Sequence, residues 1–270
     1  MPELPEVETT VRGLARVLEG RTITRVETRR AGLRRPFPVD LAQALTGARV
    51  TGLSRRAKYG LIHTDRDRTL VFHLGMSGRW RIDPGEIGKH DHLIIDTSDG
   101  QTLALNDARR FGSVDLVDTA MMDEWPAFAA LGPEPLGDGL TAGHLADAFE
   151  CRIAAVKLLL LDQRIVAGLG NIYVCEALNR AKIHPERAGG MVSKAAIARL
   201  LPEIRSVLEE AILAGGSTLR DYVRPDGELG YFAKDWRVYG REGEACPCGG
   251  TVTRVAQGGR SSFFCAKCQK

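Results

Sequence analysis

The first eight residues of the chain carry the side chains with the clearest chemical potential. If Met1 is removed, the chain begins with the secondary amine of Pro2, and the carboxylate of Glu3 follows directly. The pKa of an α-amino group lies about 2 to 3 pH units below that of a lysine, so more of it is free base at neutral pH. Such an amine condenses with an aldehyde, and the ring of proline makes the adduct an iminium that stays cationic without a proton. We therefore predict that Pro2 is a nucleophile and Glu3 its acid, although the same residues also suit the rigid, acidic start of a helix.

Four of the six cysteines lie close together at the C-terminal end. They form two pairs, Cys246-Pro-Cys248 and Cys265-Ala-Lys-Cys268, which sixteen residues separate. This arrangement indicates a tetrahedral zinc site, and four thiolates leave no open coordination position, so the zinc is predicted to be structural. The first pair is one residue shorter than usual, which is expected to weaken zinc binding. A metal-free module is the alternative.

The residues between the cysteine pairs favour a β-hairpin. Residues 251–256 and 260–264 are predicted strands around the turn 257–259, and the hairpin would bring both pairs to one metal ion. Arg260 follows two glycines at this turn, which allow close approach to a phosphate backbone. A lone exposed arginine commonly serves solubility alone, but on a hairpin that zinc holds in place it is a candidate for DNA contact.

A glycine-rich turn precedes a predicted helix at residue 171. The free N–H groups of a helix N-terminus favour phosphate, and the amide of Asn171 could be a further donor, although asparagine is also an ordinary helix cap. Glu176 lies in the same helix, which is apolar nearly all round, so its carboxylate must be paired or functional. Lys157 lies in another apolar run and raises the same question, whether it is paired or functional, although the simplest expectation there is an ammonium group that reaches the surface.

Two further turns combine glycine with cations and bulky apolar residues. A basic loop at residues 55–60 contains Lys58, and the turns His73-Leu-Gly-Met-Ser-Gly78 and Asp107-Ala-Arg-Arg-Phe-Gly112 follow it. Met76 and Phe111 are bulky apolar side chains in these turns. Such side chains serve as wedges in unstacked duplex DNA, with a place in the core as the alternative.

The elements that must position these residues change character along the chain. An amphipathic helix is predicted over residues 7–18, and short β-like runs follow at residues 22–27, 49–54, 60–64, 69–74, 92–96, 102–106 and 113–117, as in a β-sandwich or barrel. Beyond a stretch rich in glycine and proline, helices are predicted over residues 142–149, 153–161, 171–181, 194–200 and 203–214, the last after Pro202 at a helix start. The chain is thus expected to be an α+β protein with a domain that is a β-sandwich or barrel (1–131), a linker (132–142), a helical domain (143–230) and a hairpin module (231–270).

Composition sets broader limits. With 270 residues, 44% of them apolar, the chain is long enough for two domains with their own cores. The formal charge of +3 permits a nucleic-acid partner, and residues 231–270 hold seven basic against three acidic side chains, a local net charge of +4. No apolar run reaches the length of a membrane span, and the acidic N-terminus does not look like a signal peptide, so a cytoplasmic protein is expected.

Together these motifs resemble bacterial formamidopyrimidine-DNA glycosylases. The likeness extends from Pro2-Glu-Leu-Pro-Glu-Val-Glu8 to Cys265-Ala-Lys-Cys-Gln269, and it includes Arg56-Ala-Lys58-Tyr, the two turns given above, Gly168-Leu-Gly-Asn-Ile-Tyr173, Gly215-Gly-Ser-Thr-Leu-Arg-Asp221 and Val238-Tyr-Gly-Arg241. It implies an N-terminal β-sandwich, a helical domain with a helix, two-turn, helix element and a zinc-finger hairpin, with duplex DNA between the domains.

The resemblance also implies an activity and residue roles. The activity is that of a monomeric DNA glycosylase and AP lyase of the bacterial nucleoid, with one structural Zn²⁺, which excises oxidised purines and cleaves the strand by β,δ-elimination. Pro2 would attack the sugar C1′, Glu3 would act as acid and base, and Lys58 would assist. Supporting positions are Glu6, Lys157 and Glu176. Positions that would contact DNA are His73, Met76, His92, Arg109, Arg110, Phe111, Asn171 and Arg260.

Two alternatives differ from this interpretation. An endonuclease VIII-like glycosylase would share the Pro2 chemistry but prefer oxidised pyrimidines. Those enzymes typically have glycine where this chain has Leu4, and residues 217–231 resemble the loop that covers 8-oxoguanine in the first family. A DNA-binding protein that has lost its chemistry is the second alternative, which the intact Pro2, Glu3 and Lys58 oppose.

Overall fold

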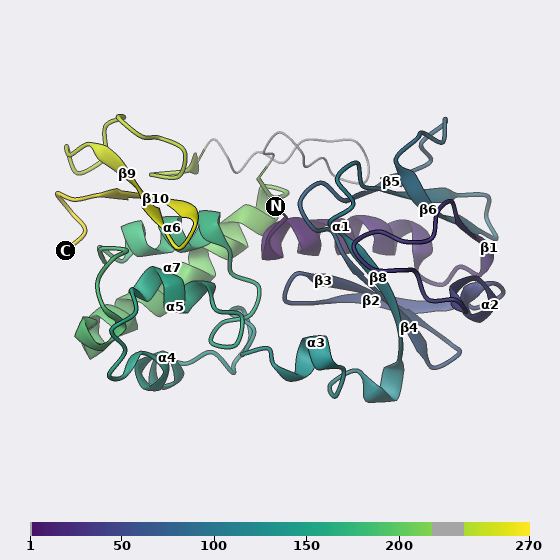
Figure 1. Ribbon diagram of the computed structural model, residues 1–270, viewed down its shortest axis with the longest axis horizontal. Coiled ribbons are helices and arrows are strands. Elements are labelled where there is room, and N and C mark those ends of the chain that lie inside the picture. Colours follow the sequence, from purple (N-terminus) through teal and green to yellow (C-terminus); the bar gives the residue numbers. More distant parts are fainter. Residues whose placement is uncertain (1, 218–234) are drawn as a thin grey trace. The chain divides into compact units, whose positions relative to one another are not determined.

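The computed structural model describes residues 2–217 and 235–270, which form two compact units. Among the described residues, the first unit comprises 2–129 and 212–217, and the second comprises 130–211 and 235–270 (Figure 1). The boundary between the two units, at residues 129 and 130, lies close to the predicted linker at residues 132–142. The finer division into four segments stays a prediction. Within these described ranges, no helix has the length and apolar character that crossing a membrane requires.

The first unit contains two antiparallel four-stranded sheets, so the predicted β-sandwich is confirmed (Figure 1). One sheet has the order β1-β6-β7-β5. Its strands are β1 (Ile23–Thr28), β6 (Asp91–Thr97), β7 (Thr102–Asn106) and β5 (Arg79–Ile82). The other has the order β2-β3-β4-β8, with β2 (Val50–Arg56), β3 (Tyr59–Thr64), β4 (Arg68–His73) and β8 (Ser113–Asp118).

Helices complete this unit. The longest of them, α1 (Leu4–Leu18), follows directly after Pro2 and Glu3. Its buried residues Val7, Val11, Leu14 and Leu18 recur every three or four positions and join the sandwich core. The helix begins three residues before the predicted start because Pro5 favours a first turn and Glu3 forms a capping box with Glu6. The other helical segments are α2 (Leu41–Leu45), a 3₁₀ turn (Thr119–Met121) and α3 (Pro126–Ala129).

The second unit is helical and ends in a two-stranded hairpin. Its helices are α4 (Ala142–Phe149), α5 (Val156–Leu161), α6 (Asn171–Arg180) and α7 (Lys194–Leu213), with a 3₁₀ turn at Gly189–Met191. The hairpin consists of β9 (Val252–Gln257) and β10 (Arg260–Cys265), as predicted to within a residue or two. The predicted linker is fixed in place, because the guanidinium of Arg205 on α7 donates to the carbonyls of Pro135, Gly137 and Leu140.

The structure corrects the expected elements at one long helix and at three short elements. Helix α7 is continuous over Lys194–Leu213 with Pro202 inside it, where two helices were predicted. Its buried side chains, among them Leu200 and Ile204, form one stripe, and burial of that stripe outweighs the backbone hydrogen bond that Pro202 cannot donate. Strand β5 and helices α2 and α3 were missed because each has only four or five residues, too few for a clear period.

Candidate functional site

Pro2 and Glu3 lie at the buried start of α1. Glu3 is the residue before the first helical turn, and its backbone N–H donates to Glu6 Oε2 at 2.8 Å. The other oxygen of the same carboxylate, Glu6 Oε1, accepts the N–H of Ser217 at 2.8 Å. Glu6 therefore links the beginning of α1 to the segment after α7, where a Cβ on Gly216 would lie 3.2 Å from its carboxylate. Met1, and the predicted lesion-covering loop beyond Ser217, lie outside the described residues.

Lys58 and His73 come together through strand pairing. Lys58 is buried in the tight turn between β2 and β3, and its neighbour Tyr59 pairs with His73 on β4. Burial, with Lys58 as the next cause, lowers the pKa of His73 to about 4. His73 is therefore neutral at physiological pH. Its Nδ1 accepts the N–H of Gly75 at 3.0 Å, which leaves the proton on Nε2, so His73 can meet a phosphate only as a neutral donor.

The two glycine turns present the predicted wedge residues at the surface of the first unit. Arg109, Arg110 and Phe111 are exposed, and the ring of Phe111 is 44% accessible although it is a large apolar group. Met76 is half-buried in the other turn. The guanidinium carbon of Arg109 lies 5.0 Å from the centre of the Phe111 ring, a cation–π contact that brings the two side chains together.

His92 does not have the surface position that a DNA contact suggests. Its side chain is only 4% exposed, and its Nε2 lies 3.1 Å from the carbonyl oxygen of Asp107. Burial lowers the pKa of His92, so the ring is a neutral support behind the turn. A direct contact between His92 and DNA stays a prediction, without support from this geometry.

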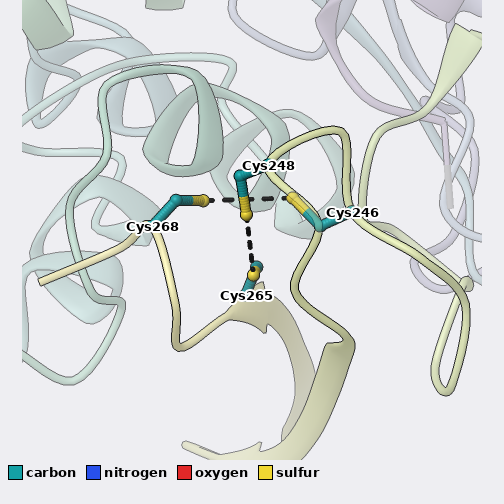
Figure 2. A group of neighbouring side chains, drawn as sticks. All are labelled: Cys246, Cys248, Cys265 and Cys268. Carbon is teal, nitrogen blue, oxygen red and sulfur yellow. Dashed lines mark hydrogen bonds between the residues drawn. The ribbon is translucent and has the colours of Figure 1, made fainter.

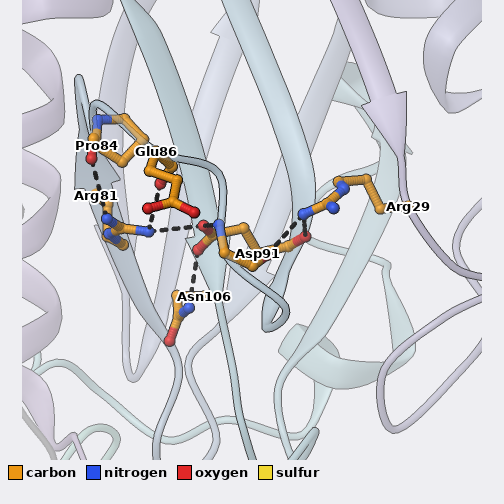
Figure 3. A network of polar contacts seen from close by, with 7 residues as sticks. Arg29, Arg81, Pro84, Glu86, Asp91 and Asn106 are labelled. Carbon is orange, nitrogen blue, oxygen red and sulfur yellow. Dashed lines mark hydrogen bonds and ion pairs between the residues drawn. The ribbon is translucent and has the colours of Figure 1, made fainter.

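Asp91 has a buried carboxylate, like Glu6, and it connects strands β5, β6 and β7 next to the turn at residues 107–112 (Figure 3). Asp91 Oδ2 accepts from the guanidinium of Arg81 at 2.6 Å and from the N–H of Gly88 at 2.7 Å, and Oδ1 accepts from Asn106 Nδ2 at 2.8 Å. Arg29 donates to the carbonyls of Gly88 and Asp91. Strands β5, β6 and β7 are thereby fixed at the end from which the turn at 107–112 departs, a role that the sequence did not reveal.

In the second unit, two of the predicted site residues bind the hairpin. Lys157 is completely buried, so the expectation that its ammonium reaches the surface is wrong. Its Nζ donates to Ser262 Oγ at 2.6 Å and to the carbonyl of Ser261 at 3.2 Å. Asn171 Nδ2 donates to the same Ser261 carbonyl at 2.8 Å. These bonds join α5 and α6 to β10 next to Arg260, and a contact of Asn171 with phosphate stays a prediction.

Glu176 is paired, as its burial requires. Its carboxylate accepts three successive backbone N–H groups, those of Arg237, Val238 and Tyr239, at 2.8 to 3.0 Å. A carboxylate in such a nest is satisfied without a cation. Glu176 therefore anchors the chain segment that leads into the cysteine loop, and a role near a lesion stays a prediction.

Arg260 lies at the tip of the hairpin, as predicted. Gln257 pairs with Arg260, and the two residues between them, Gly258 and Gly259, both have positive φ, at 57° and 74°. Such a two-residue turn suits the twist of a hairpin, and positive φ at both positions favours glycine. The side chain of Arg260 is exposed at the first position of β10.

The four cysteines meet at the base of this hairpin (Figure 2). Their sulfur atoms all lie within 4.8 Å of one another, with Cys246 and Cys268 at 3.9 Å and Cys248 and Cys265 at 3.5 Å. Zinc with bonds of about 2.3 Å to four sulfurs would separate them by about 3.8 Å, so the cluster fits the ion. A Cβ on Gly250 would lie 2.6 Å from Cys265 Sγ, so the cradle needs glycine there. These four residues form the structural zinc site of the protein.

The short first pair keeps hydrogen bonds to sulfur. The backbone N–H of Gly250 lowers the pKa of the Cys248 thiol to about 7. Burial raises the pKa of the Cys246 thiol, while the backbone N–H of Cys248 opposes that rise. Pro247, the residue between the two cysteines, differs from Cys248 and Gly250 because it has no backbone N–H to donate to a sulfur atom. Weaker zinc binding by the short pair stays a prediction, and chelator resistance equal to that of a variant with one residue inserted after Cys246 would contradict it.

Zinc removal is expected to disorder the hairpin and leave the β-sandwich folded. Metal binding supplies on the order of 10 kcal/mol in small zinc modules, whereas the sandwich has a core of its own. Metal analysis should find one zinc per chain, lost in Cys268→Ala and kept in Cys151→Ala, the control at an exposed cysteine outside the cluster. Limited proteolysis after chelation should cut within residues 243–270 first. Active protein without zinc would contradict the metal site.

The first unit is a β-sandwich with a buried proline and carboxylate at the start of α1, and the second is a helical unit that holds a four-cysteine hairpin. Three family models match successive parts of the chain. They are described as the formamidopyrimidine-DNA glycosylase N-terminal domain (residues 1–114), the formamidopyrimidine-DNA glycosylase H2TH domain (131–223) and a zinc finger found in FPG and IleRS (243–270).

Relatives match over the full length. A formamidopyrimidine-DNA glycosylase of Novosphingobium aromaticivorans is 78% identical over 270 residues, and one of Rhizorhabdus wittichii is 67% identical, each with all of both chains covered. A Lactococcus lactis FPG mutant in complex with Fapy-dG containing DNA has a TM-score of 0.92 at 35% identity over all of both chains. The MutM (FPG) protein of Thermus thermophilus has a TM-score of 0.89 at 38% identity, covering 99% of this chain and 98% of that one. The chain belongs to the formamidopyrimidine-DNA glycosylase family.

Proposed function

We propose that this protein is a bifunctional DNA glycosylase and AP lyase that excises oxidised purines from duplex DNA and cleaves the strand at the resulting abasic site. The observation that carries the proposal is the start of the chain, where Pro2 and Glu3 lie side by side at the buried beginning of α1. The substrates are 8-oxoguanine and formamidopyrimidines, in accord with the Fapy-dG in the DNA of the Lactococcus lactis complex.

The chemistry follows from a secondary amine beside a carboxyl group. After Met1 is removed, the Pro2 nitrogen attacks C1′ of the damaged nucleotide, and the bond from C1′ to the base breaks with its electron pair leaving on the base. The proton that the nitrogen loses on forming this bond passes to the departing base. Glu3 protonates the ring oxygen O4′ as the C1′–O4′ bond opens, which gives the iminium. Loss of a proton from C2′ then expels the 3′ phosphate, and a second elimination expels the 5′ phosphate. Lys58 assists at this centre.

The other residues make the target atom accessible. C1′ of a stacked nucleotide cannot be reached, and its extrusion costs a few kcal/mol that phosphate contacts and void-filling side chains must offset. Lys58, His73, Asn171 and Arg260 contact phosphates around the extruded nucleotide. Met76, Arg109 and Phe111 occupy the space that it leaves in the stack. The protein acts as a monomer in the cytoplasm, at the bacterial nucleoid.

Borohydride trapping tests the proposal. Reduction of the iminium joins the enzyme covalently to DNA, so a cross-linked band should form with duplexes that contain 8-oxoguanine. An otherwise identical duplex with an oxidised pyrimidine distinguishes the endonuclease VIII-like alternative, which would trap that lesion preferentially. No cross-link with either duplex would favour the non-catalytic DNA-binding protein.

Arg260→Ala is expected to weaken binding to all duplexes and to reduce the slope of log K against log salt by about 0.9, the value of one phosphate contact on duplex DNA. Lesion preference should stay unchanged, because phosphate contacts carry no sequence information. The slope is measured by fluorescence anisotropy of labelled duplex at salt concentrations between about 50 and 200 mM. Arg254→Ala on the neighbouring strand is the matched control, since Arg254 already pairs with Glu242 and Ser261. Loss of affinity for one lesion alone would show instead that Arg260 reads bases.

A further inference from the structure

One buried carboxylate, that of Asp107, joins the two turns that carry the wedge residues. Ser77 Oγ donates to Asp107 Oδ1 at 2.6 Å, and the N–H of Gly112 donates to Oδ2 at 2.8 Å. Ser77 Oγ in turn accepts the N–H of Arg109 at 3.1 Å. The side chains of Ser77 and Asp107 therefore hydrogen-bond each turn to the other, and Asp107 has no exposed surface.

The backbones of the two turns also touch. A Cβ on Gly75 would lie 2.3 Å from the carbonyl carbon of Phe111 and 2.5 Å from the nitrogen of Gly112, so only glycine permits this approach. The second turn is closed by the Arg110 N–H, which donates to the Asp107 carbonyl at 3.3 Å, and Arg110 itself has a φ of +58°. A non-glycine residue in this conformation needs support from its surroundings.

Asp107 is fixed in its turn from behind. Its N–H donates to the carbonyl of His90 at 2.9 Å, and its carbonyl lies 3.1 Å from His92 Nε2. The preceding residue, Asn106, donates to the buried carboxylate of Asp91 (Figure 3). The backbone of Asp107 is thus bonded to residues at the start of β6, and its carboxylate is bonded to Ser77 and to the backbone of the turn that carries Arg109 and Phe111.

We propose that Asp107 and Ser77 are positioning residues that hold Met76, Arg109 and Phe111 as one rigid unit, ready to enter the base stack. The inference rests on the proposed function. Two turns that moved independently would have to be ordered while the nucleotide is extruded, and that entropic cost would slow extrusion. Turns that are already joined avoid it. Hydrogen bonds to a charged, buried acceptor are among the stronger ones, which suits this role.

The test compares a substrate that must be unstacked with one that need not be. Ser77→Ala removes both hydrogen bonds of the hydroxyl, and Asp107→Asn replaces one acceptor oxygen by a donor. The matched control is Ser54→Ala, which removes the hydroxyl of β2 that contacts His63 on β3 of the same unit. Thermal unfolding of each variant is measured to check that the variant is folded.

Extrusion is followed by stopped-flow fluorescence of 2-aminopurine placed beside 8-oxoguanine in a duplex. Ser77→Ala is expected to slow the fluorescence rise about tenfold, as for the loss of one hydrogen bond to a charged group. Asp107→Asn should slow it at least as much, and Ser54→Ala should not change it. Borohydride trapping on single-stranded DNA with an abasic site, which needs no extrusion, should proceed in Ser77→Ala as in the unaltered protein.

Equal slowing of both reactions in Ser77→Ala would overturn the proposal, because the Pro2 centre itself would then be disturbed. An unchanged fluorescence rise would overturn it as well. Failure of the proposed function looks different, since the unaltered protein would then trap neither substrate.

Discussion

Pro2→Gly is expected to lower base excision and strand cleavage at least about a hundredfold, which corresponds to about 2.7 kcal/mol of transition-state stabilisation. Glycine keeps an α-amine at the N-terminus but loses the ring. Its adduct with C1′ is a primary-amine imine that must bind a proton to be cationic, whereas the adduct of Pro2 carries its charge permanently. Single-turnover excision of 8-oxoguanine and the yield of borohydride cross-link measure the loss.

DNA binding provides the internal check, since Pro2 contributes chemistry and not phosphate contacts. Binding of the variant to duplex with an uncleavable abasic analogue should stay close to that of the unaltered protein. Pro84→Gly is the matched control. Pro84 is half-buried between β5 and β6 of the same unit, and the carbonyl that accepts from Arg81 is retained in glycine. Equal rates of excision in Pro2→Gly and the unaltered protein would rule out Pro2 as the nucleophile.

Glu3→Gln is the second change with a large expected effect. An amide can neither donate nor accept the proton that opening of the sugar ring requires, and general acid–base catalysis contributes about 10²- to 10⁴-fold. The shape of the side chain and its place before the first turn of α1 are kept, so the fold should be intact. We expect excision to fall within that range while the midpoint of thermal unfolding stays nearly the same.

The matched control for this variant lies on the same helix. Glu8 pairs with Arg12 and Arg55, and Glu8→Gln weakens these contacts without touching the start of the chain. Its excision rate should stay near that of the unaltered protein, because partly exposed ion pairs contribute little to stability. Normal turnover by Glu3→Gln would assign the proton transfer to another group.

The buried charged residues show which features could not be predicted from the sequence. Glu176 could be predicted to have a partner, because an unpaired carboxylate in an apolar helix is too costly. The identity of that partner, a nest of three N–H groups about 60 residues further along, could not be predicted. Lys157 is the sharper case. Its ammonium finds Ser261 and Ser262 more than 100 residues away, so it is buried where the sequence suggested a surface group.

The sequence by itself determined the features whose physics is local. The spacing of cysteines predicts the zinc site, alternation and turn residues predict most strands of the sandwich, and the adjacency of Pro2 and Glu3 predicts their chemistry. The tertiary structure alone decided the rest: the neutral state of His73, the continuity of α7 through Pro202, and the joining of two turns by Asp107. Each of these depends on which distant groups surround a residue once it is buried, and burial, hydrogen-bond partners and pKa are set by that long-range packing.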